Sequence, residues 1–192
     1  MKTVKHVLRS LRELNTDVAV VGGIAMSAWE HFRSTKDVDL LILLDGMDED
    51  VLARHLAESD ILLKKDTAVE LGGIRLMQFL FEPPDLLMDI QIDLLIAKSD
   101  FHHEAVRRAT EIELTDADMT LPVASCEDLI ILKTLAGRII DRVDAVSLLQ
   151  INRAHLDIGY LMQWMDSLNI REDFSNIWAE ALPGEEMPPI PP

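Results

Sequence analysis

The sequence predicts an α/β fold, in which a small mixed β-sheet core is backed by helices and followed by a C-terminal helical subdomain. Short apolar runs that suit strands alternate with helically spaced apolar residues in the first half of the chain. Two of these runs are joined by a Gly-Gly pair, as in a β-hairpin. After Leu121-Pro122 the apolar spacing is helical. We therefore place a core at 1–120, a helical subdomain at 121–182 and a flexible proline-rich tail at 183–192.

The expected elements of the first half are a helix over 1–14, a strand over 18–21, a helix over 24–32, a strand over 36–44 and a helix over 48–58. The first helix follows from apolar residues on one face and Lys and Arg on the other. The strands are β-branched or continuously apolar, as buried strands are. Asp45-Gly46 marks a turn, and the acidic residues after it suit the first turn of a helix.

The expected elements of the second half are a hairpin over 68–71 and 74–81 around Gly72-Gly73, a strand over 86–97, a helix over 101–109, and helices that start after Ser125, run through Leu149 and cover 158–168. Ser125 with Asp128 three residues later resembles a capping box, and Gly137 suits the end of that helix. We expect the adjacent His102 and His103 to lie on a helix surface.

Charge and cysteine content limit the function classes. The chain has 192 residues, with 18 Lys and Arg against 34 Asp and Glu, so its net charge is −16. A uniform negative field argues against a general nucleic-acid or anionic-membrane coat, because phosphates would be repelled. The single cysteine, Cys126, permits no internal disulfide and favours a cytoplasmic location. The early apolar stretch 18–29 is too short to span a bilayer, so we expect no membrane partner.

The most informative acidic pair is Asp37 and Asp39. Other acid-x-acid pairs lie in polar surroundings and suit solvated faces, whereas an apolar run over 40–44 directly follows this one. Two carboxylates at the start of a buried strand point to the same side, with Cα atoms about 7 Å apart. Their repulsion is normally offset by a cation, and a divalent metal is the natural candidate.

Gly22-Gly23 lies between a predicted strand and a predicted helix. Glycine there would let a ligand approach the backbone, and the helix N-terminus offers free N–H groups to an anion. A tight turn without a ligand is the simpler interpretation of the pair taken alone.

Together, a hydrophobic residue, Gly22-Gly23, a spacer of 13 residues and Asp37-x-Asp39 resemble the motif of the DNA polymerase β-like nucleotidyltransferase superfamily. The later segment from Ser125 through Lys133, Arg138, Asp141 and Asp144 is similar, more loosely, to the helical motif of the nucleotidyltransferase toxins of abortive-infection systems, the AbiEii-like branch.

The resemblance implies transfer of a nucleoside monophosphate from a nucleoside triphosphate such as ATP to an acceptor hydroxyl, with release of pyrophosphate. Two Mg²⁺ ions, or Mn²⁺, would be held by Asp37, Asp39 and a third aspartate. We expect Asp93 rather than Asp89 to be the third, because Asp93 precedes Leu-Leu-Ile just as Asp39 does.

The same resemblance assigns nucleotide-binding residues. Gly22 and Gly23 would receive the triphosphate, while Arg33, Thr35 and Lys36 would offset its charge or position the acceptor. Lys133 would contact the phosphates, and Arg138 with Asp141 and Asp144 would shape the site. A solvated, salt-bridged helix face explains this second group equally well.

The acceptor is open: RNA or protein in a toxin-like enzyme with an antitoxin-like partner, or a small molecule as in antibiotic-modifying relatives. Two other classes also remain, a nucleotide- or partner-binding module without turnover and a structural domain with solvated acids.

Overall fold

The computed structural model describes residues 2–32, 35–64, 69–71, 74–114 and 119–190. It divides into two compact units: Met1–Ala25 with Ser34–Ala124, and Met26–Arg33 with Ser125–Pro192. We call them unit 1 and unit 2. The expected boundary at 120/121 falls inside strand β8 (Met119–Val123), which pairs with β1 (Val18–Val20) and so belongs to the sheet of unit 1.

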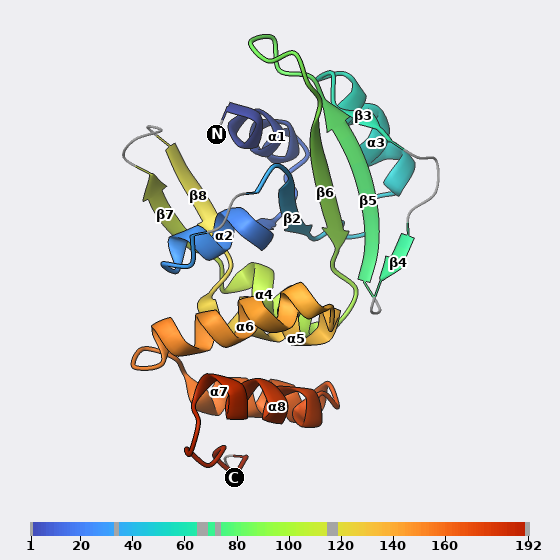
Figure 1. Cartoon of the computed structure of the whole chain (residues 1–192). Coiled ribbons are helices and arrows are strands. Elements are labelled where there is room, and N and C mark those ends of the chain that lie inside the picture. The colour runs from blue at the N-terminus through green and yellow to red at the C-terminus, as the bar shows by residue number, and fades with distance from the viewer. Residues whose placement is uncertain (1, 33–34, 65–68, 72–73, 115–118, 191–192) are drawn as a thin grey trace. The chain divides into compact units, whose positions relative to one another are not determined.

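Unit 1 is built on a mixed sheet, as the sequence predicts. Its described strands number eight, and seven of them follow the order β3-β5-β6-β2-β1-β8-β7 while β4 pairs with β5 (Figure 1). The remaining bounds are β2 (Val38–Ile42), β3 (Leu62–Leu63), β4 (Val69–Leu71), β5 (Ile74–Phe81), β6 (Ile90–Ile96) and β7 (Thr110–Leu114). The expected hairpin is present, because Leu71 pairs with Ile74; Gly72 and Gly73 lie outside the described residues.

Two helices of unit 1 pack against one face of strand β5, opposite Gln78. The helices of unit 1 are α1 (Lys2–Glu13), α3 (Glu49–Ala57) and α4 (Asp100–Arg107), and α2 (Gly22–Ala28) contributes to both units. Arg75 on β5 pairs with Glu49 of α3, and Phe81 stacks on His6 of α1. Both β5 residues have odd numbers, so strand alternation puts Gln78 on the opposite face.

Two expected elements of unit 1 differ in extent, and one hairpin was not expected. The strand expected over 86–97 begins only at Ile90, because Pro83 accepts a turn hydrogen bond from Leu86 and leaves Leu87 fully exposed. The helix expected over 24–32 ends at Ala28, shortly before Glu30 adopts a positive φ. The hairpin of β7 and β8 was not expected from the sequence, because acids alternate along β7 and a proline lies within β8.

Besides the end of α2, unit 2 contains four described helices: α5 (Cys126–Ala136), α6 (Ile139–Asn152), α7 (Ile158–Ser167) and α8 (Arg171–Ala181). The sequence predicts three of them, and α8 was not expected. Ser125 caps α5 by accepting from the Asp128 backbone N–H, and Gly137 ends it with a left-handed φ of 65°. Within the described chain no helix has the length and apolarity needed to cross a bilayer.

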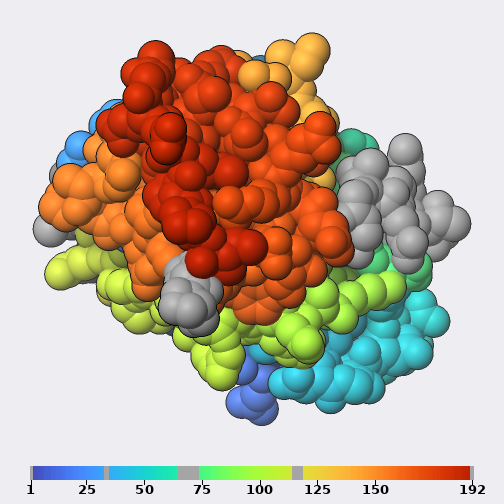
Figure 2. All heavy atoms as spheres, turned by 90° about the horizontal axis from the view of Figure 1, so that it is seen from below, coloured from blue at the N-terminus to red at the C-terminus, as the bar shows by residue number. Residues whose placement is uncertain are grey.

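The C-terminal segment beyond α8 lies along the surface of the unit 2 helices (Figure 2). Its described part, 183–190, forms no helix or strand. The Trp178 indole donates to the carbonyl of Glu185, and Arg171 donates to the carbonyl of Pro188. Its flexibility stays a prediction.

His102 is buried in α4 rather than exposed, and this makes stability depend on pH. Only 4% of its surface is accessible, and burial lowers its pKa from 6.5 to about 4. Between these pH values the unfolded chain binds a proton that the folded chain does not. The contribution of His102 to the free energy of unfolding is therefore fully present above pH 6.5 and is lost as the pH drops toward 4. At pH 4.5 the loss should be about 2 to 3 kcal/mol.

Urea unfolding at pH 7 and 4.5 checks this expectation. His102→Asn should reduce the difference in the free energy of unfolding between pH 7 and pH 4.5 by that amount, because it removes the titrating ring. His103→Asn, at the exposed neighbouring position, is the comparison: it removes only the smaller effect of the His103 charge on the pKa of His102, so it should reduce the difference much less. Equal pH dependence in His102→Asn and the parent chain would contradict the expectation.

Candidate functional site

The first part of the candidate site is the start of β2. Asp37 is exposed and directly precedes the strand, while Asp39 is its second residue and half-buried. Val38 between them is buried in the opposite face. The backbone N–H of Val21 donates to the carbonyl of Asp39 at 3.0 Å, which joins the end of β1 to the aspartate strand.

Gly22 and Gly23 let helix α2 begin directly against the aspartate segment. Gly22 has φ +61°, and a Cβ there would overlap the carboxylate of Asp39. A Cβ on Gly23 would come within 2.6 Å of the Thr35 side chain. Close approach by the protein's own side chains therefore explains both glycines, as the tight-turn interpretation expects, and their contact with a nucleotide stays a prediction.

Gly22→Ala is expected to destabilise the fold by about 2 kcal/mol or more, because it combines left-handed strain with overlap onto Asp39. Gly46→Ala is a matched control, since Gly46 has φ +85° with open space around its missing Cβ. It should cost about 1 kcal/mol, from strain alone. Thermal unfolding of both variants measures the difference, and equal losses would mean that Asp39 moves aside freely.

Asp93 lies beside Asp39 in the sheet. Strands β2 and β6 are parallel neighbours, and their register pairs Asp39 with Asp93 directly. Asp89 lies outside β6 and is exposed, so of the two acids Asp93 is the one paired with Asp39. Its role as the third metal ligand stays a prediction. Burial raises the pKa of Asp93, and the negative charge of Asp37 raises it further, against the effect of two hydrogen bonds.

Neither of the two glutamines that make those hydrogen bonds was predicted from the sequence as a residue of the site. Gln78 on β5 and Gln91 on β6 each donate from Nε2 to Asp93 Oδ1, at 3.1 and 3.0 Å. Lys64, just after β3, donates to the side-chain oxygen of Gln91. The available indication was alternation, which puts Gln91 and Asp93 on one face of the strand; pairing with Gln78 depends on a register that the sequence does not state.

The other predicted residues of unit 1 lie before β2. Thr35 donates to the carbonyl of Asp37 at 3.3 Å, and Lys36 is exposed. Arg33 lies outside the described residues. Thr35 thus orders the segment that carries the first aspartate.

The aspartates fit a divalent cation in chemistry. No three His, Cys, Asp or Glu side chains in the described ranges are arranged as metal ligands as they stand. All three predicted donors are carboxylates, however, and hard oxygen ligands are those that Mg²⁺ takes. The charge of Asp37 is felt at Asp93, and a cation bound between such acids would relieve their repulsion.

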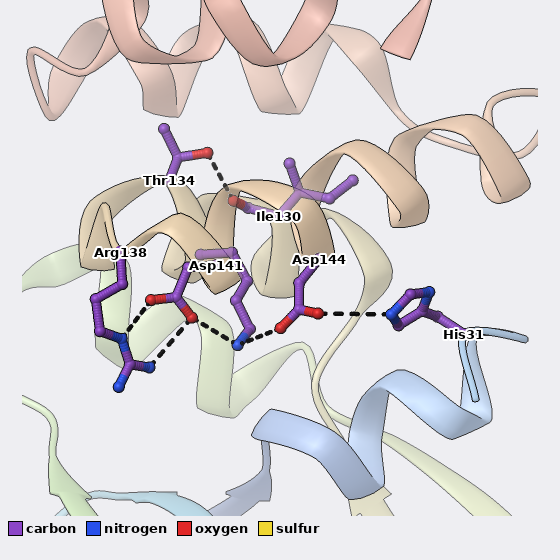
Figure 3. A network of polar contacts seen from close by, with 7 residues as sticks. His31, Ile130, Thr134, Arg138, Asp141 and Asp144 are labelled. Atoms are coloured by element: carbon purple, nitrogen blue, oxygen red, sulfur yellow. Dashed lines mark hydrogen bonds and ion pairs between the residues drawn. The ribbon is translucent and has the colours of Figure 1, made fainter. Parts of the chain in front are cut away.

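The second group of predicted residues forms a buried ion-pair network in unit 2 (Figure 3). Lys133 Nζ lies 2.8 Å from Asp141 Oδ1 and 2.9 Å from Asp144 Oδ2. Arg138 Nε donates to Asp141 Oδ2 at 2.6 Å. Burial raises the pKa of Asp141, but hydrogen bonds from Arg138 and Lys133 outweigh this and hold it below its ordinary value.

This network is not the solvated helix face that the sequence also allowed. Asp141 and Asp144 are 0% and 1% exposed and Lys133 is 8% exposed, whereas Arg138 has a largely exposed side chain. Helix α6 turns its acids toward α5, so the lysine is buried between them instead of extending into water. Removing the Lys133 ammonium would therefore take away the buried counter-charge that the two aspartates share.

His31 was not predicted as part of this network. Its Nε2 lies 3.5 Å from Asp144 Oδ1, at the opposite end of the network from Arg138 (Figure 3). No local pattern marks this histidine, because its partner lies more than a hundred residues later. Whether a nucleotide reaches Lys133 or Arg138 stays a prediction.

Solved structures with a similar fold are nucleotidyltransferases or resemble them. An antigenic nucleotidyltransferase-like protein from Paracoccidioides brasiliensis is 21% identical, with TM-score 0.60 over 93% of this chain and 87% of that chain. The antibiotic-resistance factor ANT(2″)-Ia in solution is 17% identical, with TM-score 0.54 over 88% and 90%. Its complex with adenylyl-2″-tobramycin is 16% identical, with TM-score 0.52 over 90% and 97%.

At these identities the structural likeness shows the fold alone. No curated protein matches the chain in sequence. The sequence model of the AbiEii family, described as nucleotidyl transferase toxins of type IV toxin–antitoxin systems, matches residues 6–182 and so covers the sheet, the paired aspartates and the buried network. The chain is therefore a nucleotidyltransferase and belongs to the AbiEii toxin family.

Proposed function

We propose that this nucleotidyltransferase transfers a nucleoside monophosphate from a nucleoside triphosphate to an acceptor hydroxyl, with Mg²⁺ held by Asp37, Asp39 and Asp93. The observation that carries the proposal is the register that sets Asp93 beside Asp39 on one face of the sheet. Three carboxylates gathered on one sheet face are otherwise an unfavourable concentration of negative charge.

Different residues of the chain would act on the acceptor and on the triphosphate. In the reaction an oxygen–phosphorus bond to the acceptor forms while the bond to pyrophosphate breaks, and bound Mg²⁺ would stabilise the charge on the phosphate oxygens. Asp93, as the third aspartate, would hold the metal on the acceptor side and take the proton of the acceptor hydroxyl. The N–H groups after Gly22, together with Thr35 and Lys36, would lie on the phosphate side.

Family membership favours a toxin-like reaction on RNA or protein, countered by an antitoxin in the same cytoplasm. A small-molecule acceptor is the second candidate, since the fold matches ANT(2″)-Ia, whose complex contains adenylyl-2″-tobramycin. Binding of a nucleotide without turnover is the remaining possibility.

The test is calorimetric titration of the whole chain with each nucleoside triphosphate, with and without Mg²⁺, followed by transfer of the α-³²P label. Metal-dependent binding and label on total RNA, on protein or on tobramycin would support the proposal and identify the acceptor class. Asp37→Asn with Asp39→Asn should abolish binding and transfer while the chain stays folded. Equal affinity with and without Mg²⁺ would overturn the metal site, and binding without any transfer would favour the binding module.

A further inference from the structure

The carboxylate of Asp93 has both of its hydrogen bonds on one oxygen. The side-chain amides of Gln78 and Gln91 donate to Oδ1 from two different strands. Within the described residues no hydrogen bond reaches Oδ2. Two donors on one oxygen fix rotation of the carboxylate, so the other oxygen is kept in one place for a ligand.

Gln91 is itself held in one orientation by Lys64. An amide can present either its oxygen or its nitrogen to a neighbour, and only the nitrogen can donate to Asp93. Lys64 Nζ donates to Gln91 Oε1, which turns the Gln91 nitrogen toward the carboxylate. The backbone N–H of Lys64 donates to the carbonyl of Gln78 at 2.8 Å, so Lys64 is anchored to the strand that carries the other donor.

The same site could be filled without glutamines if stability alone mattered. Positions 78 and 91 are half-buried strand positions, where β-branched or aromatic side chains are favoured. Two amides that converge on one carboxylate oxygen, one of them held by a lysine, instead serve to orient it, as the partners of a metal-ligating carboxylate do.

We propose that Gln78 and Gln91 are positioning residues that hold the carboxylate of Asp93 for the reaction, and that Lys64 sets the orientation of Gln91. The inference rests on the proposed function. It assigns the acceptor side of the site three residues, none of which contacts the reacting atoms directly.

Mn²⁺ binding to the whole chain, followed by electron paramagnetic resonance, gives a readout besides activity. Gln78→Leu and Gln91→Leu should each weaken the binding about 10- to 100-fold. Gln150→Leu is the matched control, because it removes an amide hydrogen bond of the same kind, to the Ala181 carbonyl in unit 2, and should bind Mn²⁺ as the parent does. Unchanged Mn²⁺ affinity in both site variants would overturn the proposal.

Lys64 provides a conservative pair, because its side chain is exposed and its replacement should not affect folding. Lys64→Met should lower kcat about 10-fold with KM for the triphosphate unchanged, since Asp93 acts on the acceptor side. Lys64→Arg, which keeps a donor for Gln91, should restore kcat. A change confined to KM, or no rescue by arginine, would contradict the role of Lys64.

A third measurement separates this inference from the proposed function. The side-chain amide resonances of Gln78 and Gln91 should both shift in Asp93→Ala without any metal, and that of Gln150 should not. If the parent chain binds no Mn²⁺ but these shifts occur, the metal site is wrong while the orienting contacts stand. If neither amide responds to Asp93→Ala, the positioning proposal fails whatever the metal result.

Discussion

Asp93→Ala is expected to lower kcat by about 1,000-fold while triphosphate binding is partly retained. The loss follows because the variant removes both a metal ligand and the group proposed to take the acceptor's proton. Asp39 and Asp37 stay in place, so the nucleotide side of the site remains. Single-turnover transfer assays and calorimetric titration of the triphosphate measure the two effects separately.

Asp89→Ala is the matched control. Asp89 is the same residue type and is only four positions away, but it is exposed and lies outside strand β6. Its replacement should leave kcat within twofold of the parent value. Full activity in Asp93→Ala together with none in Asp89→Ala would reverse the assignment of the third aspartate.

Lys133→Met should be the most destabilising single substitution proposed, at about 3 to 5 kcal/mol. It leaves the buried carboxylates of Asp141 and Asp144 without the ammonium that lies between them. Arg142→Met is the comparison, because Arg142 pairs with Glu180 at the surface and should cost less than about 1 kcal/mol. Urea unfolding of both variants at pH 7 tests the contrast, and similar small losses would mean that the network contributes little.

A triple variant separates the structural role of Lys133 from its predicted contact with phosphates. Lys133→Met combined with Asp141→Asn and Asp144→Asn removes the lysine and the uncompensated charges together, and should regain much of the lost stability. If this folded variant also binds the triphosphate normally, the network is structural only. Loss of nucleotide binding in a stable triple variant would support the phosphate contact.

Local patterns in the sequence predicted most of the fold. Helix α1, strand β1, the hairpin of β4 and β5 and the caps of α5 each depend on residues close together in the chain. The hairpin of β7 and β8 was missed because its pairing partner, β1, lies a hundred residues earlier and its own pattern is acidic. Helix α8 was missed although its buried residues follow the helical i, i+3, i+4, i+7 spacing: Phe174, Ile177, Trp178 and Ala181.

The residues of the candidate site also divide into those marked by a local pattern and those defined by a partner far away in the chain. Asp93 could be preferred over Asp89 because matching apolar triplets indicated equal depth in neighbouring strands. Gln78 and His31 could not be found, since each is defined by a partner in another element. His102 could have been placed correctly, because it shares the apolar face of α4 with Phe101, Ala105 and Val106.

The pairing of β2 with β6 limits how the lengths of homologous chains can vary. Five successive residue pairs match, from Val38 with Ile92 to Ile42 with Ile96. A single-residue insertion inside either strand would turn every following side chain to the other face and separate the two acids. Insertions and deletions should therefore collect where the chain leaves the sheet, as in 82–89. In an alignment of distant relatives, the two apolar triplets at 40–42 and 94–96 should contain no gaps, whereas the length of chain between them should vary.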